Sequence, residues 1–285
     1  YEGGRQVVII HDAHTMQTAA ANSLLKILEE PPEGVYFILT APVGDSLLQT
    51  ILSRVVWVRL REKAENNDVT VTVGEDGNYK VTVKRDIDQT IDVPDKWETV
   101  NVDLNGKTIT GDNATANAPA KPGMNFIGSG EPNAPGTNLI VSNGKVQGGS
   151  GTSQNPDGAP GIGTGKSPNN PKNAGLTVGE KAEILGGNGA DGTENSPNGG
   201  NGGAGISGEV TPTIDGGKVT GGSGGNGADS STGNGGNGGD GGNGVKVDNK
   251  DVTIVNGTVS GGTAGNGGNS TAPGGNGGQG GSGGN

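Results

Sequence analysis

The sequence predicts a mixed fold, in which a partial α/β segment is followed by an all-β parallel β-helix, or solenoid, with glycine-rich arms. Three observations lead to this prediction. Residues 1–62 alternate apolar runs with helical patterns, residues 69–111 alternate apolar and polar residues, and Gly-Gly pairs recur at a long period after that. Glycine divides the chain in the same way, since only four of its 61 glycines lie in residues 1–62.

Composition narrows the classes of function. The net charge is −11 and no basic cluster is present, so we expect no direct nucleic-acid binding. Apolar residues make up 28% of the chain, which is too few for a large conventional core over most of its length. The chain has no cysteine, which excludes disulfides and thiolate metal sites, and no apolar run is long enough to span a membrane.

The first segment begins with an apolar run, "QVVII" at 6–10, that predicts a strand buried on both faces of a parallel sheet. A helix is predicted at 19–30, capped by Thr18 and ended by the two prolines at 31–32. The predicted apolar face of this helix consists of Ala20, Leu24, Leu25 and Leu28.

Three further elements complete this segment. A second buried strand is predicted at 35–40, a helix at 44–54 and a third strand at 55–60. The order strand–helix–strand–helix–strand is typical of an α/β parallel sheet. Functional residues of such a sheet lie at the carboxyl ends of its strands.

Those ends carry the candidate site residues. Asp12 follows the first strand, Thr40 ends the second, and Arg54 precedes the third. An acidic residue in such a place usually holds Mg²⁺ on a nucleotide. An arginine at a helix end can act as a finger on a phosphoryl group, often in a neighbouring subunit.

Four motifs lie in this segment, namely "VVIIHDAH", "AAANSLLKILEEPP", "YFILT" and "TILSRV". On these motifs, residues 1–62 resemble the bacterial DNA polymerase III clamp-loader family of the delta-prime type. The resemblance implies a fragment of a P-loop ATPase (AAA+) of DNA replication, with Arg54 as a trans-acting arginine finger, Asp12 at the Walker B position and Thr40 at the sensor position. It also implies a cytoplasmic location, with other clamp-loader subunits and their bound ATP as partners.

Three departures from the family pattern bear on activity. His11 stands where the pattern has its Mg²⁺-binding aspartate, Val55 replaces the cysteine of the Ser-Arg-Cys motif, and the chain has no G-x-x-x-x-G-K-[ST] phosphate loop. We therefore predict no cofactor and no nucleotide hydrolysis by this chain alone; the enzyme would be the parent DNA polymerase holoenzyme. The plainer alternatives are a surface arginine at 54, and histidines at 11 and 14 that are ordinary polar residues rather than metal ligands.

A charged linker at 63–68 leads into residues 69–144, which we predict to be the opening coils of the solenoid. The sequence from 93 to 111 resembles the opening coil of right-handed β-helix domains on bacterial surface proteins. A hairpin turn is predicted at 74–77. Strands with one buried face are predicted at 69–73, 79–83, 99–104 and 107–111.

Residues 145–285 carry a repeat of about 35–40 residues. Each unit contains a Gly-Gly pair that closes a short strand. The pairs begin at Gly148, Gly186, Gly221 and Gly261, at spacings of 38, 35 and 40 residues. Self-similarity at this period indicates a solenoid or stacked array.

The stretches between these strands have a period of three, in which two glycines alternate with one other residue. This pattern suits polyglycine-II-like arms with three residues per turn, and the alternative is a disordered glycine-rich linker. The interleaved strands favour the ordered form. The third positions are Asn234, Asn237, Asp240 and Asn243 in one arm, Asn276, Gln279, Ser282 and Asn285 in another, and Asn198, Asn201 and Ala204 in a third.

Three copies of a Gly-Gly-Asn-Gly-x-Asp motif match the start of a calcium-binding nonapeptide, with Asp191, Asp229 and Asp240 as weak candidate ligands. The apolar position of the nonapeptide is missing in each copy. The copies are not in tandem either, so the ligands that consecutive turns would share are lacking. We therefore expect no metal site, and no catalytic site after residue 62.

Two functions follow from these observations. One is a non-catalytic fragment of a delta-prime-like clamp-loader subunit, acting in DNA replication and fused to a surface-type glycine-rich repeat. The other is an exported, adhesin-like β-solenoid at the cell surface with a structural or glycan-binding role, whose N-terminal piece comes from a chimeric or fragmentary reading frame. Ice binding is disfavoured because few threonine ranks recur at fixed spacing.

Overall fold

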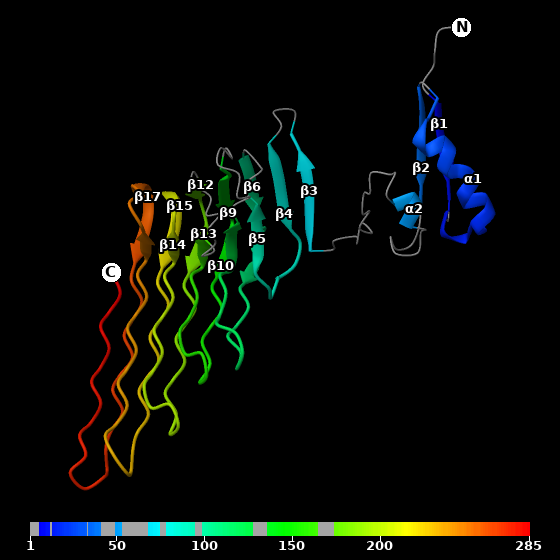
Figure 1. The fold of residues 1–285 in the computed structure, drawn as a ribbon. Helices are drawn as coiled ribbons and strands as arrows, with labels where there is room; N and C mark the ends of the chain where they lie inside the picture. The colour runs from blue at the N-terminus through cyan, green and yellow to red at the C-terminus, as the bar shows by residue number, and fades with distance from the viewer. Residues whose placement is uncertain are drawn as a thin grey trace. The chain divides into compact units, whose positions relative to one another are not determined.

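The computed structural model divides the chain into two compact units, residues 1–64 and 65–285, and each is described by itself (Figure 1). The described residues are 6–11, 13–32, 34–40, 49–52, 68–74, 78–94, 99–127, 136–164 and 174–285. Within these ranges, no helix has the length and apolar character needed to cross a membrane.

The first unit contains a strand–helix–strand arrangement. β1 and β2 pair in parallel, with Gln6 opposite Val35 and Ile10 opposite Leu39. This parallel pairing was expected, because two apolar runs joined by a helix usually form a crossover of this kind. The elements are β1 (Gln6–Ile10), the 3₁₀ helix η1 (Ala13–Thr15), α1 (Thr18–Glu29), β2 (Val35–Leu39) and α2 (Gln49–Leu52).

The prediction that both strands of this unit are buried on two faces is wrong. Side chains alternate along β1, so that Val7 and Ile9 are 54% and 53% exposed. In β2, Tyr36 and Ile38 are exposed in the same way. In the described part of the unit, only two strands pair and one long helix lies beside them, which is too little structure to cover both faces.

The start of α1 also differs from the prediction. The helix begins at Thr18, one residue earlier than predicted. Gln17, whose backbone is extended, is therefore the N-cap residue in place of Thr18. The buried residue in the first turns is Ala21, at 2% exposure, whereas Ala20 is exposed. Of the predicted helix at 44–54, the structure describes a helical turn at Gln49–Leu52, and the predicted strand at 55–60 lies outside the described residues.

The second unit is a β-solenoid of parallel strands, preceded by one antiparallel hairpin between its first two strands. Strands are present where they were predicted, at 69–73, 79–83, 99–104 and 107–111. The prediction of one buried face is wrong for the first of them, in which Val71 and Val73 are 51% and 60% exposed. The strands are β3 (Val69–Val73), β4 (Tyr79–Val83), β5 (Ile91–Pro94), β6 (Thr99–Asp103), β7 (Thr108–Thr110), β8 (Met124–Ile127), β9 (Asn138–Ser142), β10 (Gly144–Gln147), β11 (Ile162–Thr164), β12 (Ala174–Val178), β13 (Ala182–Leu185), β14 (Ile206–Gly208), β15 (Val210–Thr220), β16 (Val245–Val247) and β17 (Thr253–Ser260).

The strands stack into three faces. Face A contains β4, β6, β9, β12 and the first half of β15; face B contains β7, β10, β13 and the second half of β15; face C contains β5, β8, β11, β14 and β16. β15 runs through the corner between faces A and B, and β17 pairs with both of its halves. Each coil of the solenoid therefore adds one strand, or half of a long strand, to each face.

The core of the solenoid is a set of ladders of inward apolar side chains. On face B, Val146, Ile184 and Val219 are each 0% exposed, and the strand register places Ile184 between the other two. On face C, Ile162 and Ile206 pair in the same way. The two-residue alternation of the sequence explains this arrangement, because every second side chain of a strand points to the same side.

Five arms leave the solenoid after the strands of face B. We number them arm 1 (111–123), arm 2 (148–161), arm 3 (186–205), arm 4 (221–244) and arm 5 (261–285). Arms 2 to 5 begin at the Gly-Gly pairs singled out in the sequence. They become longer along the chain and run side by side (Figure 1).

Hydrogen bonds join each arm to its neighbours with a period of three. In arm 4, Gly224 N donates to Thr263 O in arm 5 at 2.8 Å, and Gly225 N donates to Gly200 O in arm 3 at 2.8 Å. Asn226 N, the third of the triplet, donates to Asp191 Oδ1 in arm 3 at 2.7 Å. All three amides of the triplet therefore have hydrogen-bond partners. A backbone N–H group that is buried away from water needs such a partner.

Glycine allows these backbones to come close together. A Cβ placed on Gly225 would overlap the carbonyl oxygen of Ala190, and one on Gly222 would overlap that of Gly187. Any side chain at these two positions would therefore push the arms apart. The outward third positions carry no such restriction, and the sequence places Asn, Asp, Ser and Thr there.

Candidate functional site

The structure places one of the predicted clamp-loader residues at the carboxyl end of the sheet in the first unit. Thr40 N donates to Ile10 O at 2.9 Å, and Ala13 N donates to Thr40 O at 2.8 Å. Thr40 therefore lies against the end of β1 and the segment that follows it. This is the geometry that a parallel pair of strands gives to residues at their carboxyl ends.

The other two predicted residues of that site, Asp12 and Arg54, lie outside the described residues. Their roles at the Walker B and arginine-finger positions therefore stay predictions. His14 lies in the 3₁₀ helix η1. Within the described ranges, no group of three or more His, Cys, Asp or Glu side chains could hold a metal ion.

The three candidate calcium ligands each make a hydrogen bond between arms. The carboxylate of Asp191 accepts from Asn226 N at 2.7 Å, and that of Asp240 accepts from Ser282 N at 2.7 Å. Asp229 accepts from Asn269 N at 2.6 Å. One carboxylate oxygen of each is thus already bonded to the next arm, so these residues connect arms in the same manner as the asparagines.

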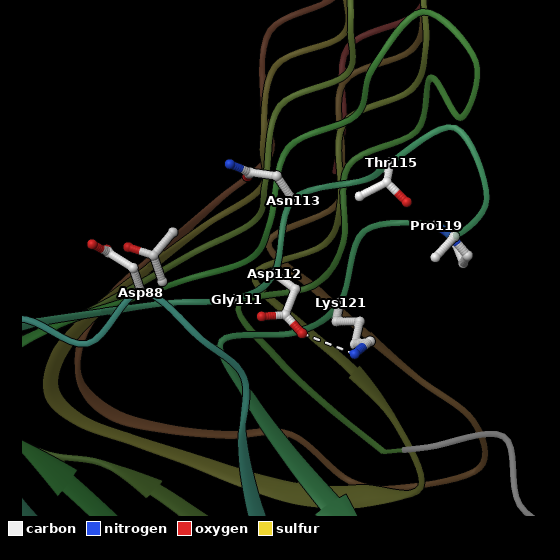
Figure 2. A pocket seen from close by; sticks show the side chains of 9 residues that line it. Asp88, Gly111, Asp112, Asn113, Thr115, Pro119 and Lys121 are labelled. Atoms are coloured by element: carbon white, nitrogen blue, oxygen red, sulfur yellow. Dashed lines mark hydrogen bonds and ion pairs between the residues drawn. The ribbon is translucent and has the colours of Figure 1, made fainter.

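A cleft of about 600 Å³ lies along arm 1. Figure 2 shows Asp112 and Lys121 on the outgoing and returning parts of the arm, joined by a hydrogen bond of 2.8 Å between Lys121 Nζ and Asp112 Oδ2. The remaining lining residues are Asp88, Thr110, Gly111, Asn113, Thr115, Ala118 and Pro119. The cleft therefore offers carboxylate, ammonium, amide and hydroxyl groups within one space.

In the described part of the chain, arm 1 has a neighbouring arm on one side only, where it bonds to arm 2, and the cleft lies along it. In the preceding coil of the solenoid, Ile87 forms a β-bridge with Ile109. Only three residues, 88–90, then connect Ile87 to the start of β5. Sequence reasoning missed this site. The available signal was the absence of a glycine-rich stretch between 83 and 91, together with the non-glycine sequence "DNATANAPAKPG" of arm 1.

The ion pair between Asp112 and Lys121 stabilises the charged forms of both side chains. The hydrogen bond from Lys121 lowers the pKa of Asp112, and the same bond raises the pKa of Lys121. Both groups are therefore ionised at neutral pH. Because the pKa of Asp112 is lowered, any stability that it contributes is present above the ordinary pKa of a carboxyl group and is lost as the pH falls through the lowered value.

Replacing Lys121 with methionine is expected to raise the pKa of Asp112 towards the ordinary value for aspartate, since the main cause of its lowering is removed. Titration of the carboxyl carbon by NMR measures this change. Lys145→Met on face B is the matched control and should leave the titration of Asp112 unchanged. An Asp112 pKa that is the same in wild type and Lys121→Met would contradict the described pair.

The first unit is similar to known proteins. Residues 1–64 match the family model described as "DNA polymerase III, delta subunit". The DNA polymerase III subunit delta' of Yersinia pestis is 51% identical over 53 residues, which are 19% of this chain and 16% of that protein. The corresponding subunit of Haemophilus influenzae is 49% identical over 57 residues, 20% of this chain and 17% of that protein.

A third relative, DNA polymerase III subunit gamma/tau of Mycobacterium tuberculosis, is 47% identical over 49 residues, 17% of this chain and 8% of that protein. The chain thus spans about a sixth of the length of the delta' relatives that it matches. No solved structure is significantly similar to this chain.

Proposed function

We propose that residues 1–62 are a non-catalytic, clamp-loader-like module of the AAA+ class that acts through other subunits in DNA replication. The observation that carries this proposal is the match of residues 1–64 to the delta subunit family, at about half identity to delta' proteins. The position of Thr40 at the carboxyl end of the parallel strands supports it. On this proposal the module acts in the cytoplasm.

The chemistry of the proposed module is to complete a site on a neighbouring subunit. The sequence has no phosphate loop, so it lacks the amides and lysine that hold the β- and γ-phosphates of ATP. Arg54 would instead contribute its guanidinium to the γ-phosphate of ATP bound by an adjacent clamp-loader subunit, where it stabilises the charge of the transition state. Thr40 and Asp12 would occupy the sensor and Walker B positions.

This function predicts no ATP hydrolysis by the purified chain and measurable binding to a DNA polymerase III gamma/tau subunit. If the finger acts in trans, Arg54→Ala should lower the ATPase rate of the mixture by about 10³-fold or more relative to wild type. A coupled ATPase assay measures the hydrolysis rate of the chain alone and that of the mixture. Arg85→Ala, in the solenoid, is the matched control and should leave the rate unchanged.

Two results would contradict the proposal. One is ATP hydrolysis by the chain alone that disappears in Asp12→Ala or Arg54→Ala. The other is the absence of any binding to gamma/tau subunits from bacteria whose delta' proteins match residues 1–64. In the second case, the N-terminal piece would be an inactive remnant from a chimeric reading frame.

We propose, as a second candidate, that the solenoid is a structural and glycan-binding module of a surface protein, with polyglycine-II-like arms. The cleft of arm 1 favours this function, because its carboxylates, hydroxyls and ammonium match the hydrogen-bonding groups of sugars. Screening the whole chain on a glycan array tests it. The proposal predicts at least one bound glycan whose binding is lost in Asp88→Asn or Lys121→Met, and an array without binding would overturn it.

A further inference from the structure

We propose that the Asn-Gly steps of arm 3 are latent sites of deamidation, which the hydrogen bonds from arm 3 to arm 4 keep unreactive. This inference is independent of the proposed functions, since it uses neither a nucleotide nor a glycan. It rests on contacts that the two arms make with each other. The three steps are Asn188-Gly189, Asn198-Gly199 and Asn201-Gly202.

Deamidation is least hindered at Asn-Gly, because glycine has no side chain beside the attacking nitrogen. Hydroxide removes the proton of the glycine N–H group, and this nitrogen forms a bond to Cγ of the asparagine. The bond from Cγ to Nδ2 breaks, and ammonia leaves with a proton taken from water. Water then opens the succinimide ring to aspartate or isoaspartate. The reaction therefore needs a free glycine N–H group and an asparagine side chain that can turn towards it.

Arm 4 holds both of these groups at the first step. Asn188 Oδ1 accepts from Ser223 N at 3.0 Å, and Gly189 N donates to Ser223 O at 2.8 Å. The attacked side chain and the attacking nitrogen are thus bonded to the same residue of the neighbouring arm. We call this pair of hydrogen bonds an Asx clamp.

The other two steps have the same Asx clamp. The partner residue is Asn237 for Asn198 and Asp240 for Asn201, and the N···O distances are 2.8 Å and 2.9 Å in both clamps. Hydroxide can reach a hydrogen-bonded amide only after the bond opens, as in amide hydrogen exchange. Deamidation in arm 3 therefore requires arms 3 and 4 to separate.

Burial of the asparagines does not supply this protection. Asn188, Asn198 and Asn201 are all exposed to solvent, so water can reach their side-chain amides and carry the leaving ammonia away. The Asx clamps are therefore the feature of the folded arm that blocks the reaction.

The packing of the arms requires the same residues that make the steps labile. A Cβ on Gly189 would overlap the carbonyl oxygen of Gly200, and one on Gly202 would overlap that of Gly222. The residue before each glycine supplies a side-chain oxygen to the next arm, and asparagine does this without adding a charge. The reactive Asn-Gly step and its protection thus have one structural cause.

An arm that stays open is altered irreversibly. Isoaspartate places an additional methylene group in the backbone, which breaks the period of three on which the Asx clamps depend. An arm that contains it cannot return to its register with arm 4. The folded arms are therefore chemically durable, whereas prolonged opening prevents them from packing again.

Incubation of the full chain at mildly alkaline pH, followed by mass spectrometry, tests this inference. Trypsin cuts after Lys181 and Lys218 and nowhere between them, so one peptide, 182–218, contains all three steps. Wild type in buffer should deamidate in this peptide at least about tenfold more slowly than wild type in concentrated urea. Equal rates in the two samples, with the strands still folded in buffer by circular dichroism, would overturn the inference.

Two variants show whether the contacts between arms are the cause. Gly225→Ala places a methyl group against the carbonyl oxygen of Ala190 in arm 3 and should raise the deamidation rate of the folded chain at least about fivefold. Gly233→Ala is the matched control and should leave the rate unchanged, because the nearest atom to a Cβ there is Ser230 Oγ at 3.9 Å. A folded Gly225→Ala chain that deamidates as slowly as wild type would contradict the inference. If Gly225→Ala does not fold, the comparison of wild type in buffer and in urea decides alone.

Discussion

Gly225→Ala in arm 4 is expected to destabilise the solenoid by about 3 kcal/mol, which is the upper part of the range for overpacking a tightly packed interior. The added methyl group would overlap the carbonyl oxygen of Ala190 in arm 3. The arms would have to separate, which would also weaken the bonds from Gly225 N to Gly200 O and from Gly239 N to Gly225 O. Urea unfolding followed by circular dichroism measures the loss.

The matched control for this prediction is Gly233→Ala, near the tip of the same arm. The nearest atom to a Cβ at Gly233 is Ser230 Oγ at 3.9 Å, which is an ordinary contact. We expect a change within about 0.5 kcal/mol, with a small gain if the alanine restricts the unfolded chain. Equal stability losses in the two variants would show that close packing of the arms is not the cause.

Ile184→Ala is expected to cost about 3–4 kcal/mol, the usual loss for truncating a fully buried isoleucine. Ile184 is 0% exposed and lies between Val146 and Val219 in the ladder of face B, so neighbours on both sides lose contacts. Glu183→Ala, in the same strand but exposed, is the control and should change stability little. A loss for Ile184→Ala no larger than for the control would contradict the described core.

The solenoid strands could be predicted from the sequence because their signal is local. Alternation of apolar and polar residues marks which side chains point inward, and a Gly-Gly pair marks where a strand of face B ends. β10, for example, ends at Gln147, directly before Gly148. The division into three faces could not be read in this way, because it depends on which strands meet after each corner.

The contacts between arms could not be predicted because they join residues that lie far apart in the sequence, such as Asp191 and Asn226, 35 positions apart. Nothing in the local sequence of Asp191 shows that its carboxylate accepts from Asn226 N. The cleft of arm 1 was missed for a similar reason, since it depends on the shortness of the preceding turn. In the first unit, the opposite error occurred: apolar runs such as the one containing Val7 predicted burial that one helix cannot provide.

The candidate site of the first unit depends on resemblance more than on geometry. Thr40 is at the expected end of the strands, whereas the roles of Asp12 and Arg54 rest on matched motifs. The physical patterns alone, a short apolar strand followed by polar residues, are shared by many α/β proteins. Family motifs therefore carry the functional prediction here, and the enzymatic assays described above are what test it.

The arms are an ordered, hydrogen-bonded part of the solenoid. Native-state hydrogen exchange by NMR on arm 4 tests this most directly, through the amides of Gly224, Gly225 and Asn226. We expect all three amides to be protected from exchange. Exchange at unstructured-chain rates throughout 221–244, with the strands still protected, would contradict it.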